Sequence, residues 1–436
     1  MSGLRSYERD AAPLAAGEDA ALAPPREDEL LALVRQNLTR PGAMPPTAAR
    51  WVYARWKPAI SLTAGFELDY ADGERRFVSW KRYAGGKALE LLGRRERPIA
   101  PDVADERLLE HTVLAESGAH LWAPPFDREL PGLERASDLR RTKRWFIEQG
   151  LFSGLAVRSG SSHATLLRYK PERRAVLRLD LRLRPVEGGP KTAEVLGARA
   201  LPPAQAQRIA RARRVWQTTP ASAVTPRLLA CEERVGVIYE EWLDVETCAR
   251  DAFDLAHDAG SLLARVHAER APAIEPADAH GIGSAVELLS TQPQLRSRAL
   301  SIAIAPRDAL ERTAWTHGDF HPDQLARSRS DGALRLLDLD RLGPGNALDD
   351  LASWVADHLS EHPEAGLREA ASDLLSGYAA AGGRLPAMED LALGASEGLV
   401  QRAAGALRRL EAGAVAKASR LLDQARDLAP KGILFA

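Results

Sequence analysis

Acidic and amide side chains gather between residues 315 and 352, where the sequence reads WTHGDFHPDQLARSRSDGALRLLDLDRLGPGNALDDLA. Asp319 lies in a polar segment that ends at Gln324, and an apolar run leads into Asp338. Mg²⁺ takes hard oxygen ligands, usually one or two carboxylates together with phosphate oxygens and water. A carboxylate beside a hydroxyl can orient that hydroxyl or accept its proton. A loop carrying Asp319 and a strand ending in Asp338 would meet both demands of phosphoryl transfer.

Two β-rich segments precede this acidic region. Strand-like patterns and turn signals occupy 51–83 in the first segment, and 164–171, 174–185 and 192–201 in the second. The first contains RWKP and the second RYKP, each followed by a β hairpin and then by a helix, expected at 87–95 and 203–216. We interpret this repetition as a weak internal duplication, with convergent β patterning as the alternative.

Helical patterns dominate the rest of the chain. A buried strand at 234–244 leads into an acidic, aromatic connector, and apolar residues at helical spacing then predict a helix over 252–268. Ala- and Leu-rich segments beyond residue 350 predict several more helices. We therefore expect an α+β protein with two lobes and a cleft between them. The expected divisions are a disordered segment at 1–27, an accessory unit at 28–150, a β-rich lobe at 151–243 and a helical lobe at 244–436.

The composition of the chain argues against several classes of protein. The 436 residues carry a formal net charge of −1, which argues against binding to nucleic acid or to an anionic membrane. Cys231 and Cys248 have neither metal-site spacing nor a disulfide pattern, as is usual in a reducing cytosol. The N-terminus lacks the order of a signal peptide, and no apolar run approaches the roughly 18 to 20 residues that span a bilayer. We expect a cytoplasmic protein and leave its oligomeric state open.

The sequence HGDFHPDQ followed by LLDLDRLGPGNALDDLA resembles the catalytic and metal-binding loops of the aminoglycoside phosphotransferase and choline kinase-like family, in a bacterial variant with HGDFxxDQ. A weaker resemblance extends over about 160–425. The resemblance implies a bilobal, protein-kinase-like fold with a β-rich N-lobe, a helical C-lobe and an N-terminal unit similar to a second N-lobe. It also implies ATP or another nucleoside triphosphate and Mg²⁺ as cofactors, and a small-molecule hydroxyl as acceptor.

The same resemblance implies roles for individual residues. Asp319 would be the catalytic carboxylate that faces the acceptor hydroxyl, and His317 would brace its loop through backbone hydrogen bonds. Asp338 would be the principal metal ligand, Gln324 would stand at the position of the second ligand, and Asp340 would support the metal or its waters. The alternative for the acids is that they only cap helices and turns.

Further positions follow from the resemblance. Asp350 would tie the metal-binding loop to the helix that follows it. The backbone at the end of the 234–244 strand, which includes Glu241, Trp242 and Leu243, would receive the adenine. Arg199, or Ala198 if the register shifts by one residue, stands where the family has a lysine that contacts the phosphates of the nucleotide.

The sequence departs from the family at two of these positions. Gln324 replaces an asparagine, which keeps the ligating carbonyl oxygen but adds a methylene group. Arg199 has a planar fork in place of a compact ammonium group, and no acid follows it between residues 200 and 217. We therefore expect Arg199 to lack its usual glutamate partner. In the first β segment, Lys81 and Glu90 could be counterparts of the missing pair, although an ordinary exposed lysine is the simpler interpretation of Lys81.

Three functions compete at this point. An ATP-dependent kinase of a small-molecule hydroxyl fits both acidic loops, whereas a pseudokinase or nucleotide-binding regulator fits the altered Arg199. A protein kinase is weaker, because no DFG- or APE-like segment follows the metal-binding loop. Residues that could select the acceptor, unless they form a solvated helix face, are Trp354, Asp357, His358, Glu361 and Glu364.

Overall fold

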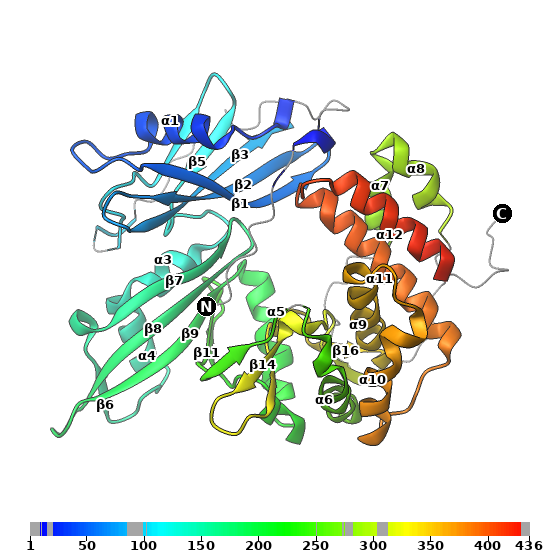
Figure 1. Ribbon diagram of the computed structural model, residues 1–436. Helices are drawn as coiled ribbons and strands as arrows, with labels where there is room; N and C mark the ends of the chain where they lie inside the picture. Colours follow the sequence, from blue (N-terminus) through cyan, green and yellow to red (C-terminus); the bar gives the residue numbers. More distant parts are fainter. Residues whose placement is uncertain are drawn as a thin grey trace. The chain divides into compact units, whose positions relative to one another are not determined.

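The computed structural model describes residues 9, 11–14, 21–84, 99–101, 103–249, 251–272, 274, 282–302 and 313–428. These residues fall into two compact units (Figure 1). The β-rich unit comprises Leu4–Ala210 and Leu228–Trp242, and the helical unit comprises Arg211–Arg227 and Leu243–Ala436. The predicted α+β class, with a β-rich first part and a helical second part, is confirmed.

The first sheet is antiparallel and has the strand order β1-β2-β3-β5-β4. Its strands are β1 (Ala48–Lys57), β2 (Ser61–Asp69), β3 (Arg75–Tyr83), β4 (His111–Leu114) and β5 (Ala119–Trp122), and α1 (Glu27–Asn37) packs against β1. Strands β4 and β5 were not predicted from the sequence. One face of the sheet is apolar, whereas the other carries buried polar side chains such as Thr63, Ser79 and His120. The helix expected at 87–95, with Glu90, lies outside the described residues.

The second sheet contains the predicted strands of 164–201 as β7 (His163–Lys170), β8 (Arg174–Pro185) and β9 (Thr192–Ala200). They are joined by β6 (Leu155–Val157), β10 (Leu228–Glu232) and β11 (Val237–Glu241). Burial alternates along β8, and its leucines pack with Leu133 of α3 (Pro131–Ser137) and Phe146 of α4 (Leu139–Glu148). On the opposite face, Ile209 of α5 (Pro203–Trp216) packs with Ile238. The two faces of the second sheet thus have separate apolar layers.

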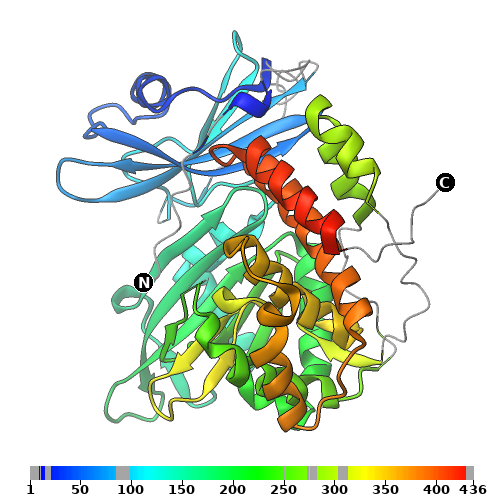
Figure 2. The same cartoon turned by 45° about the vertical axis from the view of Figure 1, so that its right-hand side comes forward.

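The helical unit is built around packed helices. Helix α6 (Ala256–Ala268) packs against α10 (Leu367–Ala380), and α11 (Met388–Arg408) packs against α12 (Ala414–Leu428), α9 (Ala347–Glu361) and α7 (Ile282–Ser290), as Figures 1 and 2 show. Helix α8 (Pro293–Leu300) contacts α7 and α12. The described part of this unit also contains the short strands β12 (Val245–Thr247), β13 (Ala314–Thr316), β14 (Leu325–Ser328), β15 (Leu334–Leu336) and β16 (Gly343–Gly345).

The burial of four side chains differs from what the sequence suggested. The disorder expected over 1–27 does not hold at Leu14 and Leu22, which are buried side chains. The solvated helix face expected around Trp354 and Asp357 is also absent at these two residues, because both are fully buried. The carboxylate of Asp357 accepts a hydrogen bond of 3.0 Å from Nε of Arg402 on α11, which explains how the charge is accommodated. Among the described residues, no helix is long and apolar enough to cross a membrane.

The packing of α4 on the second sheet gives a stability prediction. Phe146→Ala removes a ring that is 1% exposed, and we expect it to lower the free energy of unfolding by about 3–5 kcal/mol. The neighbouring Ile147 is 58% exposed, so Ile147→Ala is expected to cost less than about 1 kcal/mol. Urea denaturation of both variants measures the difference. Equal losses would mean that α4 does not cover the sheet through Phe146.

Candidate functional site

Two short strand pairs bring the acidic loops together. The first acidic loop, residues 317–324, joins β13 to β14, and the second acidic loop, residues 337–342, joins β15 to β16. Strand β13 pairs with β16, and β14 pairs with β15, both antiparallel. Each loop is therefore held at both of its ends beside the other loop.

Close backbone contacts tighten this arrangement. The N–H of Leu337 donates to the carbonyl of Gln324 at 2.8 Å, and Nε2 of His317 lies 2.8 Å from the carbonyl oxygen of Leu337. Gly318 has a φ of +78°, and a Cβ atom there would come within 2.9 Å of the carbonyl oxygen of Arg341. Glycine is required at this position for both reasons. Gly318 of the HGD sequence thus allows the second acidic loop to pack closely against the first.

Asp350, in the first turns of α9, anchors the first acidic loop. Its side chain is fully buried, and it accepts hydrogen bonds from the N–H of His317 at 2.7 Å and from the N–H of Gly318 at 2.8 Å. Nε2 of His267 lies 3.1 Å from the same carboxylate, and Nδ1 of His267 lies 3.0 Å from the Tyr378 hydroxyl. These contacts connect the loop to α6, α9 and α10.

Asp319 lies at the accessible edge of this arrangement, with about half of its side chain exposed. Burial raises its pKa, but the positive charge of Arg341 and, more weakly, of His321 and His317 outweighs that effect. The carboxylate of Asp338 acts on Asp319 in the opposite direction. The net result is a pKa below the ordinary value of 3.8, so Asp319 is ionised at neutral pH.

The residues at the junction of the two loops fit a Mg²⁺ ion. Gln324 is 9% exposed, and its amide nitrogen lies 3.0 Å from Nε2 of His321, which leaves the amide oxygen for another partner. Asp338 adopts left-handed backbone angles, φ 55° and ψ 57°, directly before the short helical turn that contains Asp340. Among the described residues, no group of three or more His, Cys, Asp or Glu side chains is arranged to hold a metal. A carboxylate and an amide still suit Mg²⁺, which takes further ligands from phosphate and water.

Arg199, in the β-rich unit, has a glutamate partner after all. It lies on β9 and is 6% exposed, and its Nε atom is 3.3 Å from Oε1 of Glu240 on β11. Glu240 lies opposite Gly197 in the sheet, where a Cβ atom would come within 3.2 Å of the Glu240 side chain. Arg199 therefore lacks the usual glutamate on the following helix, as expected, but it has a carboxylate partner on the adjacent strand.

The remaining predicted residues lie at the end of β11. Glu241 is its last residue, and the guanidinium group of Arg178 lies 5.5 Å from the ring centre of Trp242. The boundary between the two units falls between Trp242 and Leu243. The expectation that Lys81 is exposed is wrong, since it is 8% exposed and forms an ion pair.

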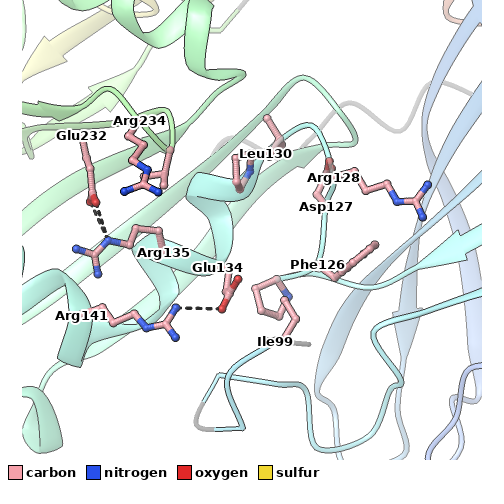
Figure 3. A pocket seen from close by; sticks show the side chains of 13 residues that line it. Ile99, Phe126, Asp127, Arg128, Leu130, Glu134, Arg135, Arg141, Glu232 and Arg234 are labelled. Atoms are coloured by element: carbon pink, nitrogen blue, oxygen red, sulfur yellow. Dashed lines mark hydrogen bonds and ion pairs between the residues drawn. The ribbon is translucent and has the colours of Figure 1, made fainter. Parts of the chain in front are cut away.

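A cavity of about 540 Å³ lies elsewhere in the β-rich unit (Figure 3). None of the predicted site residues lines it. Two of its arginines are paired with acids, Arg135 with Glu232 at 2.8 Å and Arg141 with Glu134 at 3.3 Å. These ion pairs connect α3 and α4 to the β10–β11 hairpin and give the cavity little net charge.

A family model described as "Phosphotransferase enzyme family" matches residues 153–385, more than half of the chain. The chain belongs to this family. The match includes Arg199 and both acidic loops, and it confirms the predicted family and the prediction that the protein is a phosphotransferase enzyme.

Several solved structures are similar to this chain at low sequence identity. Ethanolamine kinase from Plasmodium vivax has 9% identity and a TM-score of 0.45, with 69% of this chain and 94% of that chain covered. Choline kinase LicA from Streptococcus pneumoniae has 11% identity and a TM-score of 0.40, with coverages of 66% and 99%. Macrolide 2′-phosphotransferase type I has 15% identity and a TM-score of 0.39, with coverages of 67% and 98%. Among curated protein sequences, none matches the chain.

The hydrogen bonds of Asp350 predict a large loss of stability on its removal. Asp350→Ala leaves two backbone N–H groups and His267 without their acceptor, and we expect a loss of about 3 kcal/mol or more. The adjacent Asp349 is exposed, so Asp349→Ala is expected to cost less than about 1 kcal/mol. Chemical denaturation compares the two variants. A small loss for Asp350→Ala would contradict its anchoring role.

The charge of Arg341 gives a titration prediction. Arg341→Gln should raise the pKa of Asp319, because it removes the strongest of the charges that lower this pKa. The lowered value means that ionised Asp319 favours the folded state above about pH 3.8, and this contribution is lost as the pH falls through the folded-state pKa. Carboxylate titration by ¹³C NMR measures the change. Arg335→Gln, next to Asp331, is the control and should leave Asp319 unaffected, whereas equal pKa values in all three proteins would contradict the assignment.

Proposed function

We propose that this protein is an ATP- and Mg²⁺-dependent phosphotransferase that phosphorylates a hydroxyl group of a small molecule, such as a sugar, an aminoglycoside or an amino alcohol. The main support is the pairing of the two acidic loops, with ionised Asp319 in one loop and Asp338 in the other. Phosphoryl transfer needs these two functions side by side: a carboxylate for the acceptor and an oxygen ligand for the metal. Cys231 and Cys248 are not in disulfide bonds, in agreement with the cytoplasmic location that we also propose.

Asp319 orients the acceptor in this proposal. Its pKa lies below 3.8, so its carboxylate is a weak base that holds the hydroxyl by a hydrogen bond and receives the proton late. His317 fixes the loop through its contact with Leu337 and through its own N–H, which donates to Asp350. The loop backbone is thereby set before any substrate binds, which lowers the cost of positioning the hydroxyl.

Asp338 and Gln324 would hold the metal ion in this proposal, with support from Asp340. When bound, Mg²⁺ would supply positive charge that offsets the negative charge of the transferred phosphoryl group. His321 assists through Gln324, because its hydrogen bond to the amide nitrogen fixes which way the amide oxygen faces. The extra methylene of glutamine is thus held in one conformation.

The nucleotide is bound by β9 and by the chain at the end of β11 in this proposal. Arg199 contacts its phosphates, and the backbone at Glu241, Trp242 and Leu243 receives the adenine. The Glu240 carboxylate beside Nε keeps the guanidinium group in place, as the usual helix glutamate does for lysine. This ion pair favours the enzyme over the pseudokinase alternative, because the alternative drew its support from an Arg199 without a partner.

Substitutions in the acidic loops test the proposal. Asp319→Asn should lower kcat by about 10²- to 10⁴-fold and change the Kd for the nucleotide little, because it removes the acceptor's carboxylate alone. Asp338→Asn should abolish the Mg²⁺-dependent part of nucleotide binding. Calorimetry measures the binding, and ADP release with a panel of sugars, aminoglycosides and amino alcohols measures turnover. Asp323→Asn, on an exposed carboxylate of the same loop, is the matched control.

The outcomes separate the two functions. Absence of nucleotide binding to the unmodified protein, with or without Mg²⁺, would overturn both. Magnesium-dependent binding without turnover of any acceptor would favour the nucleotide-binding regulator. Turnover that disappears in Asp319→Asn and persists in Asp323→Asn would establish the kinase.

A further inference from the structure

The two sheets of the β-rich unit have the same topology. The first has the order β1-β2-β3-β5-β4, and five strands of the second have the order β7-β8-β9-β11-β10. All of these neighbours pair antiparallel. This identity extends the similarity of the RWKP and RYKP tetrapeptides to whole sheets, and it supports the internal duplication inferred from the sequence.

The turns that follow the tetrapeptides are also equivalent. Lys57 pairs with Ser61 across the first turn, and Lys170 pairs with Arg174 across the second. Ala59 and Glu172, at the same position of each turn, have positive φ values of 55° and 60°. Each turn therefore has a residue with left-handed backbone conformation at the same position.

The pairing register of the strands shows which residues of the two third strands, β3 and β9, are equivalent. In the first sheet, Arg55 lies opposite Thr63, which lies opposite Lys81. In the second sheet, Arg168 lies opposite Val176, which lies opposite Arg199. Lys81 thus occupies in the first sheet the position that Arg199 occupies in the second.

Lys81 is paired with the turn of the other sheet. Its Nζ atom donates to both carboxylate oxygens of Glu172 at 2.7 Å, and the Thr63 hydroxyl donates to Glu172 at 3.4 Å. The side chains of Lys81 and Glu172 are 10% and 16% exposed, so water screens this pair little. The β7–β8 turn, residues 171–173, is held against the polar face of the first sheet.

A second set of hydrogen bonds holds the same turn from the connector between the sheets. Buried Asp127 accepts from the N–H of Glu172 at 2.9 Å and from the Tyr169 hydroxyl at 2.7 Å. That hydroxyl accepts in turn from Nε1 of Trp122 on β5 at 2.8 Å. Figure 3 shows Asp127 in the segment that leads from the first sheet to α3.

We infer that the first sheet is a clamp that positions the β7–β8 turn for nucleotide binding, with Lys81 and Asp127 as its positioning residues. The inference rests on the proposed function, because in protein kinases a glycine-rich loop covers the nucleotide phosphates and the phosphate-binding lysine lies on the third strand. The β7–β8 turn and Arg199 on β9, the third strand of the order β7-β8-β9, correspond to that loop and that lysine. That turn is usually rich in glycine, but residues 170–174 here read KPERR. A turn with charged side chains and no glycine needs its backbone fixed from outside to keep a single conformation.

Lys81→Met tests the clamp because it removes the charge and keeps a side chain of similar length. We expect a KM for ATP at least about tenfold higher, with the KM for the acceptor changed less than about threefold. Hydrogen exchange at the Glu172 and Arg173 amides should become faster, since their acceptors are fixed by the clamp. Arg82→Met, one residue further along β3 and on its other face, is the matched control and should alter neither quantity.

Charge exchange provides the second variant. Lys81→Glu combined with Glu172→Lys should recover most of the slow amide exchange and of the ATP KM, whereas each single reversal should lose both. Fast exchange in the unmodified protein, or unchanged exchange and KM in Lys81→Met, would overturn the clamp. A protein with slow exchange at the turn but no nucleotide binding would overturn the proposed function and not the clamp contacts, so the two failures are distinguishable.

Discussion

The site in the helical unit depends on one buried carboxylate, that of Asp350. A buried charge is costly unless donors surround it, and Asp350 has two backbone N–H groups and His267 as partners. It belongs to α9, whose Trp354 is buried, so the packing of a helix fixes the backbone of the loop that carries Asp319. The strand pairs β13–β16 and β14–β15 then set the distance between this loop and the next. The position of the accessible Asp319 carboxylate is therefore set by the packing of α9 and by these two strand pairs.

The third strand of each sheet carries a buried cation that also depends on a charged partner. A buried cation needs a carboxylate, but geometry does not require that carboxylate to come from the next helix. Arg199 finds Glu240 on the adjacent strand, and Lys81 finds Glu172 on the turn of the other sheet. A planar guanidinium group reaches sideways along a sheet more easily than a compact ammonium group does, because its nitrogens are spread over a fork. In the proposed function, Glu240 thus takes the place of the carboxylate that the following helix lacks.

The sequence predicted those strands and helices whose buried residues recur at a regular spacing along the chain. Strand β8 alternates between buried and partly exposed residues along its length, and α5 matches the predicted helix, because each packs one continuous face. Strands β4 and β5 escaped prediction because each is short and is stabilised by neighbours far away in the sequence. The family resemblance pointed to Asp319, Asp338 and Gln324, but it gave no sign of two residues that contact them. His321 contacts Gln324 from three residues earlier in the same loop, and Arg341 approaches Asp319 from the second acidic loop. The burial of Lys81 was unpredictable for the same reason, since its partner lies 91 residues away.

The ion pair between Lys81 and Glu172 is better explained by specificity than by stability. Removing two charges from water costs several kcal/mol for each ion, and their attraction often does no more than offset that cost. An apolar pair in the same place would pack the sheets together as well, but it would allow the turn to slide, since apolar contacts have little directional preference. Lys81 donates to both oxygens of one carboxylate, and Asp127 accepts from the backbone of the same residue, so only one placement of Glu172 satisfies all these groups. The polar face of the first sheet thus binds part of the same chain, and the result is a fixed conformation of the β7–β8 turn.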